Sequence, residues 1–165
     1  MRVAIALVCL LAVHAVSGPA PWAQAPAPTP TDRTKASVFS AADLASALAK
    51  LSADRPSSAV RVFTLAPYNV NVERRLPKPQ GASLHEAQAE LFYVIEGSAT
   101  LLTGGALVAP TRTGTNLAGT GIENGTRQPF GKGDFLIVPS GLPHQFVDIQ
   151  APVHLMSIYL PNAPQ

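Results

Sequence analysis

The sequence predicts an all-β barrel or sandwich of many short strands, preceded by one helix. From Ala59 onward, apolar and polar residues alternate with the period of two that a half-buried strand requires. Turns rich in glycine separate the later β-forming runs, at Gly97-Ser98, Gly104-Gly105 and Gly131-Lys-Gly133. The 165 residues suffice for one domain with its own core.

The N-terminus has the composition of a secretory signal peptide. Arg2 is followed by an apolar run, Val3 to Val13, and then by small residues. This run is shorter than the about 20 apolar residues that cross a membrane. We expect residues 1–25 to be the signal peptide, cleaved after Ala15 or Ala25, and the protein to be periplasmic or secreted.

The remaining composition excludes several classes of site. Cys9 lies in the signal segment and is the only cysteine, so the mature chain offers neither a disulfide nor a thiolate. The 12 basic and 10 acidic residues form no basic patch, so nucleic acid is not expected as a partner. We expect a small molecule as partner, and any metal site must use imidazole and oxygen ligands.

Two segments precede the strands. Residues 26–36 contain several prolines and alanines and predict an extended linker, which leads to a domain at residues 37–165. Within that domain, Ser40 and Asp43 have the spacing of a capping box, and leucines follow at helical spacing. The pattern predicts a helix over about 41–51 that packs outside the main body.

Short β-forming runs cover most of the remaining chain. Alternating valines predict the first two strands between Val60 and Val72. Further strands are expected, in order, at 91–96, 99–103, 106–108, 128–130, 135–138, 145–149 and 153–160. The segment Thr111–Gly125 has no periodicity and is rich in threonine, glycine and asparagine. We expect it to be a long loop, either a functional lid or simply mobile.

Two stretches place metal-ligating residue types at strand ends. In the first, GASLHEAQAELFYVIEG (81–97), His85 and Glu90 precede a strongly β-forming run. In the second, GKGDFLIVPSGLPHQFVD (131–148), His144 follows a turn built from proline and glycine. If all three side chains point to the mouth of the barrel, they form a site for a divalent ion such as Fe, Mn, Zn or Ni.

The first stretch resembles the first conserved motif of the cupin superfamily, G-x5-H-x-H-x3,4-E-x6-G. The chain matches this motif at His85, Glu90 and Gly97, while Gly81 stands near the leading glycine at a shortened offset. Where the family has its first histidine, this chain has Ser83.

The second stretch resembles the second cupin motif, G-x5-P-x-G-x2-H-x3-N. The match comprises Gly133, Pro139, Gly141 and His144, and Asp148 stands where asparagine is usual. Both motifs occur in the family's order, and together they span about half of the chain that remains after signal cleavage.

The resemblance implies a single cupin-type double-stranded β-helix, which is a jelly-roll barrel. It also implies a divalent metal ion bound by His85, Glu90 and His144. The remaining coordination positions of the metal would be filled by a water or by Ser83, whose hydroxyl is a weak ligand for such an ion.

Strand periodicity places further residues in the interior. Phe92, Phe146 and Asp148 have the parity of the expected ligands on their strands, so we expect them to line the pocket or fill the barrel. Asp148 has a second interpretation, as the group that orients His144. His154, in the last predicted strand, is expected either to line the pocket or to serve a structural role.

Three functions fit such a site. The first is a metal-dependent enzyme on a small organic molecule, similar to the dioxygenases or isomerases of the superfamily. The second is a cupin that binds a small ligand, such as a sugar or an acid, without converting it. The third is a metal-free structural cupin. The resemblance also implies a homodimer formed through sheet edges.

Overall fold

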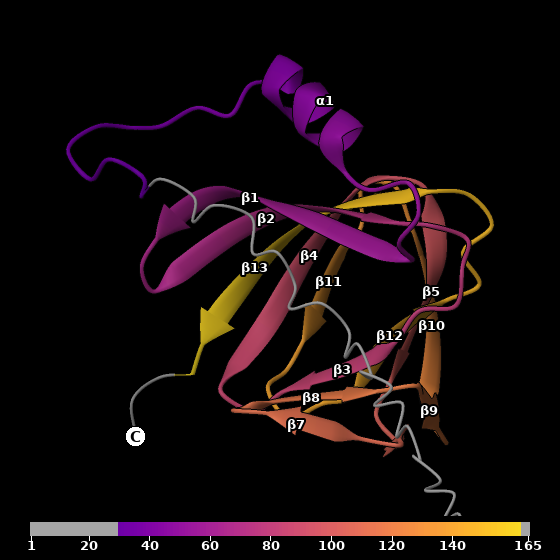
Figure 1. Ribbon diagram of the computed structural model, residues 1–165. Helices are drawn as coiled ribbons and strands as arrows, with labels where there is room; N and C mark the ends of the chain where they lie inside the picture. The colour runs from indigo at the N-terminus through magenta and orange to yellow at the C-terminus, as the bar shows by residue number, and fades with distance from the viewer. Residues whose placement is uncertain (1–29, 163–165) are drawn as a thin grey trace, which may run out of the picture.

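The computed structural model describes residues 30–162 (Figure 1). The predicted signal peptide, and the part of the expected linker before residue 30, lie outside the described residues. Within the described part, no helix has the length and apolar character needed to cross a bilayer.

One helix, α1 (Ala41–Lys50), precedes the strands, as the sequence predicts. Its capping box is formed: the Ser40 hydroxyl accepts the backbone N–H of Asp43, and the Asp43 carboxylate accepts the backbone N–H of Ser40. The helix packs on the outside of a sheet (Figure 1). Ala47 in the helix and Leu51 just beyond its end are buried. The predicted position of the helix is therefore confirmed.

Thirteen strands follow in residues 30–162. In chain order they are β1 (Ser57–Leu65), β2 (Tyr68–Arg75), β3 (Ala82–His85), β4 (Gln88–Glu96), β5 (Ser98–Thr103), β6 (Ala106–Val108), β7 (Thr111–Thr113), β8 (Asn116–Gly119), β9 (Gly121–Glu123), β10 (Thr126–Gly131), β11 (Phe135–Val138), β12 (His144–Val147) and β13 (Val153–Pro161). They form a five-stranded sheet, β1-β2-β13-β4-β11, a six-stranded sheet, β10-β5-β12-β3-β8-β7, and the pair β6-β9. The ladders within these sheets are antiparallel.

The two larger sheets enclose an apolar core between their inner faces (Figure 1). Burial alternates along β4, so that Glu90, Phe92 and Val94 lie on its inner side. Strands of both sheets contribute to the core, which consists of Phe92, Val94, Ala99, Leu101, Phe130, Val138, Phe146, Val153 and Leu155. This is the all-β jelly-roll architecture that the sequence predicts.

The segment Thr111–Gly125 is not the long loop that the sequence predicts. It contains β7, β8 and β9, and β8 pairs with β3 from Ala82↔Gly119 to His85↔Asn116. β7 pairs in turn with β8. These strands are largely exposed, so their stability comes from backbone pairing and no apolar alternation marks them in the sequence.

Candidate metal centre

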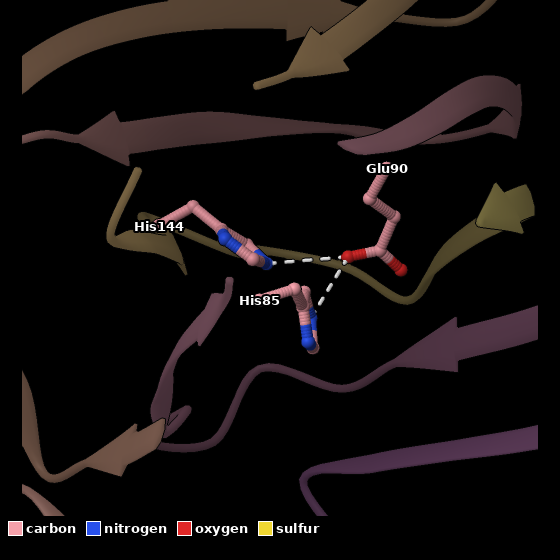
Figure 2. Close-up of side chains that lie close together, drawn as sticks. All are labelled: His85, Glu90 and His144. Carbon is pink, nitrogen blue, oxygen red and sulfur yellow. Dashed lines mark ion pairs between the residues drawn. The ribbon is translucent and has the colours of Figure 1, made fainter. Parts of the chain in front are cut away.

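Three side chains from three different strands converge in the barrel (Figure 2). His85 is the last residue of β3, Glu90 lies in β4, and His144 is the first residue of β12. Glu90 Oε2 lies 3.4 Å from His85 Nε2 and 3.3 Å from His144 Nε2. One carboxylate oxygen therefore faces two imidazole nitrogens.

The spacing of these atoms suits a single metal ion. Bonds from zinc to nitrogen or oxygen are about 2.0–2.2 Å, so two ligand atoms lie about 3.0 Å apart at a right angle and about 3.4 Å apart at a tetrahedral angle. The two N–O separations fall in this range, and one ligand atom from each residue lies within 4.8 Å of the others. Two imidazoles and one carboxylate form a donor set that leaves open positions on a first-row ion. The group can therefore hold a divalent metal.

Pairing between distant strands brings these residues together. β12 pairs with β3 at Ser83↔His144, which places His85 two residues further along β3 on the same face as Ser83. β4 belongs to the opposite sheet and places Glu90 on the same side as the core residue Phe92. The candidate site thus joins the two sheets of the barrel. A role for Ser83 as a weak fourth ligand stays a prediction.

The electrostatics of the site favour an ionised carboxylate. Glu90 is 3% exposed, and burial alone would raise its pKa, but hydrogen bonds from His144 and His85 outweigh burial and lower the pKa to about 2. Burial acts to lower the pKa of His85, yet hydrogen bonding to Glu90 and Asn116 raises it overall. Glu90 is therefore an anion at neutral pH, which is the form that binds a metal.

Two residues beside the site are missed by the sequence patterns. Asn116 Oδ1 lies 2.7 Å from His85 Nδ1, but Asn116 falls in the segment expected to be a loop. Tyr159, in β13, packs edge-on against His85 with ring centroids 5.2 Å apart, and burial together with the charge of Glu90 raises its pKa. The burial pattern of the folded β13 places Tyr159 on the side of Val153 and Leu155, but both sides of this strand carry apolar residues, so the sequence alone offers no comparable signal.

Phe92 and Phe146 fill the barrel beside the site. Phe92 is 0% exposed and Phe146 is 2% exposed. Their rings meet edge to face with centroids 5.2 Å apart, and the Phe92 centroid lies 6.5 Å from that of His144. Phe92 therefore packs beside His144, and Phe146 packs on Phe92 within the core.

The predicted inward position of Asp148 is wrong, and Asp148 does not orient His144. Asp148 follows β12 with a φ of 57°, so the chain leaves the strand alternation there. Its carboxylate forms an exposed ion pair with Arg127, and hydrogen bonds from Thr100 and Arg127 lower its pKa. His144 Nδ1 instead lies 3.4 Å from the carbonyl oxygen of Leu142.

The predicted pocket-lining position of His154 is also wrong. Its neighbours Val153 and Leu155 are buried in the core, so alternation directs His154 to the outer face of the sheet. Its cross-strand partners there are Arg74 and Glu96. Burial, reinforced by the charge of Arg74, lowers the pKa of His154. The other interpretation, a structural role for His154, stays a prediction.

Comparison with solved structures identifies the fold. The cupin domain of Cnp3 from Schizosaccharomyces pombe is 13% identical to this chain, with a TM-score of 0.50 over 70% of this chain and 72% of that one. The Fe(II) form of HppE is 17% identical, with a TM-score of 0.50 over 64% of this chain and 51% of that one. The matched region thus spans about half the length of HppE.

The chain therefore has the cupin fold, as its two motifs predict. No protein-family model and no curated protein matches the sequence. At these identities the structural similarity establishes the fold alone, so the activity must be argued from the site.

Proposed function

We propose that this protein is an exported cupin that binds a divalent first-row metal ion through His85, Glu90 and His144. The observation that supports the proposal is the position of both imidazole Nε2 atoms at 3.4 and 3.3 Å from one buried carboxylate oxygen. Three protein ligands leave coordination positions for Ser83 or water and for a small molecule. The Fe(II) form of HppE is a metal-containing structure of similar fold, although it does not identify the metal here.

The proposed activity is conversion of a small organic molecule, as in a dioxygenase-like or isomerase-like enzyme. When bound, the metal would supply Lewis-acid chemistry or a binding position for O₂. The chain supplies the surroundings: Phe92 and Phe146 exclude water on the core side of the site. Tyr159 lies within hydrogen-bonding reach of Glu90, where its hydroxyl can also donate to an oxygen atom of a bound molecule.

A metal-free structural cupin is the second candidate, and one observation favours it. Both histidines interact directly with Glu90, so this buried carboxylate has polar partners even without a metal. The metal content of the protein decides between the two candidates.

The deciding measurement is the metal content of protein purified without a histidine tag. We expect stoichiometric metal in the wild type and none above background in His144→Ala, because that change removes one of three ligands. His154→Ala is the matched control, since His154 lies on the outer face. A wild-type protein that contains no metal, and that takes none up when the ion is added, would refute the metal site.

A second measurement distinguishes an enzyme from a binding protein. Oxygen consumption by the metal-loaded protein is followed with aromatic and dicarboxylic acids, and product analysis reports isomerisation. Turnover that disappears in His144→Ala supports the enzyme. Saturable binding of a sugar or an acid without turnover would identify the protein as a binding cupin.

A further inference from the structure

We propose that Asn116 is a positioning residue that holds His85 in the ring orientation and tautomer needed for metal binding. The inference rests on the proposed metal site, which it deepens by adding the β7–β8 hairpin to it. Asn116 is not a ligand in this proposal; it acts through His85.

The contact between the two residues is direct. Asn116 and His85 are cross-strand partners in β8 and β3, and Asn116 Oδ1 lies 2.7 Å from His85 Nδ1. The other ring nitrogen, Nε2, faces Glu90. An imidazole that donates its Nδ1–H to an amide oxygen keeps the Nε2 lone pair for a metal, because the hydrogen bond at one nitrogen selects the proton position at both.

The hairpin that carries Asn116 is attached to the chain next to His85. The backbone N–H of Glu86 donates to the carbonyl oxygen of Thr115 at 2.9 Å. Arg112 donates through both terminal nitrogens to the Glu86 carboxylate, at 2.6 and 2.9 Å. A bidentate pair of this kind fixes the relative orientation of the two side chains and also stabilises the contact between them. These contacts hold β8 in register with β3, which keeps Asn116 opposite His85.

Two aromatic neighbours limit the ring of His85 on its other sides. Tyr159 packs edge-on against it at 5.2 Å between centroids, and the ring of His144 lies at 5.4 Å. These contacts restrict the position of the ring without choosing which nitrogen is protonated. Asn116 is itself exposed, so its side chain contributes little to apolar burial. We therefore infer that Asn116 acts on the site through its hydrogen bond to His85.

The test uses three variants of the full chain. Asn116→Leu removes the acceptor at similar size, and Asn116→Asp keeps an acceptor oxygen at the same place. Thr113→Leu is the matched control, because Thr113 is exposed and pairs with Asn116 across the hairpin. Zinc affinity is measured by competition with a chelator. We expect Asn116→Leu to weaken zinc binding by about 10- to 100-fold, as loss of such partners does, and the other two variants to stay near the wild type.

A nitrogen-15 NMR spectrum of the zinc-loaded protein provides the second readout. We expect the His85 Nδ1–H proton to exchange slowly with water in the wild type and in Asn116→Asp, and rapidly in Asn116→Leu. Unchanged zinc affinity and unchanged exchange in Asn116→Leu would overturn the inference. An equal loss of affinity in Thr113→Leu would also overturn it, because hairpin folding would then be the cause. A wild-type protein that binds no zinc or other first-row ion would instead remove the proposed function, and the inference with it.

Discussion

Replacing Glu90 by glutamine tests the buried carboxylate through the pH dependence of stability in the metal-free protein. Burial opposes ionisation, but the hydrogen bonds from His144 and His85 lower the pKa of Glu90 from 4.5 to about 2. A group whose pKa is depressed on folding stabilises the fold above its unfolded-state pKa and loses that contribution as the pH falls. The contribution of Glu90 is therefore present above about pH 4.5 and lost on the way to about pH 2.

The magnitude follows from the size of the shift. One pKa unit corresponds to about 1.4 kcal/mol, so a change from 4.5 to about 2 corresponds to about 3 kcal/mol of unfolding free energy. Solvent screening reduces this little, because Glu90 is 3% exposed. The variant lacks the titrating group, so it should lack this part of the acid sensitivity.

The assay is urea unfolding of the metal-free wild type and Glu90→Gln, followed by circular dichroism at several pH values between about 6 and 2.5. The difference in unfolding free energy between the two proteins should shrink by about 2–3 kcal/mol over this pH range. Glu123→Gln is the control for the substitution itself, because Glu123 is exposed on β9. A difference between wild type and Glu90→Gln that stays constant with pH would refute the buried ion pair.

Three further predictions concern the site, the core and assembly. Although burial opposes it, hydrogen bonding raises the pKa of His85 above its ordinary 6.5. The metal-free wild type should therefore lose stability as the pH rises from about 6.5, a loss that thermal unfolding should not show in His85→Gln. Phe92→Ala should reduce the unfolding free energy by about 3–5 kcal/mol, because Phe92 is fully buried in the core. The matched change Val38→Ala, at a residue that is 85% exposed, should have a much smaller effect in the same urea titration. Phe135 and Ile137 are exposed on β11, an edge strand of the five-stranded sheet, and are the expected contact of the predicted homodimer. Light scattering should show a dimer for the wild type and a monomer for Phe135→Lys/Ile137→Lys, and a monomeric wild type would contradict the prediction.

Features that depend on residues close together along the chain could be predicted from the sequence. The capping box of α1 joins Ser40 and Asp43, which are three residues apart, so the start of the helix can be predicted without knowing the fold. Apolar alternation is likewise a property of a single strand, which is why most strands were placed correctly. Motif spacing also named His85, Glu90 and His144, the three residues that the fold brings together.

The sequence does not show which distant strands pair or which face of each strand lies inside, because both depend on the folded arrangement of the sheets. Asn116 reaches His85 across 31 positions of sequence, from a short strand that is only partly covered and has no apolar pattern. The inward direction of Tyr159 depends on the pairing of β13 with β2 and β4. Asp148 leaves the alternation because its backbone turns to a positive φ. Each of these features depends either on hydrogen bonds between separate strands or on backbone geometry beyond the end of a strand. Neither kind of interaction leaves a local periodicity in the sequence, so the sequence does not predict it.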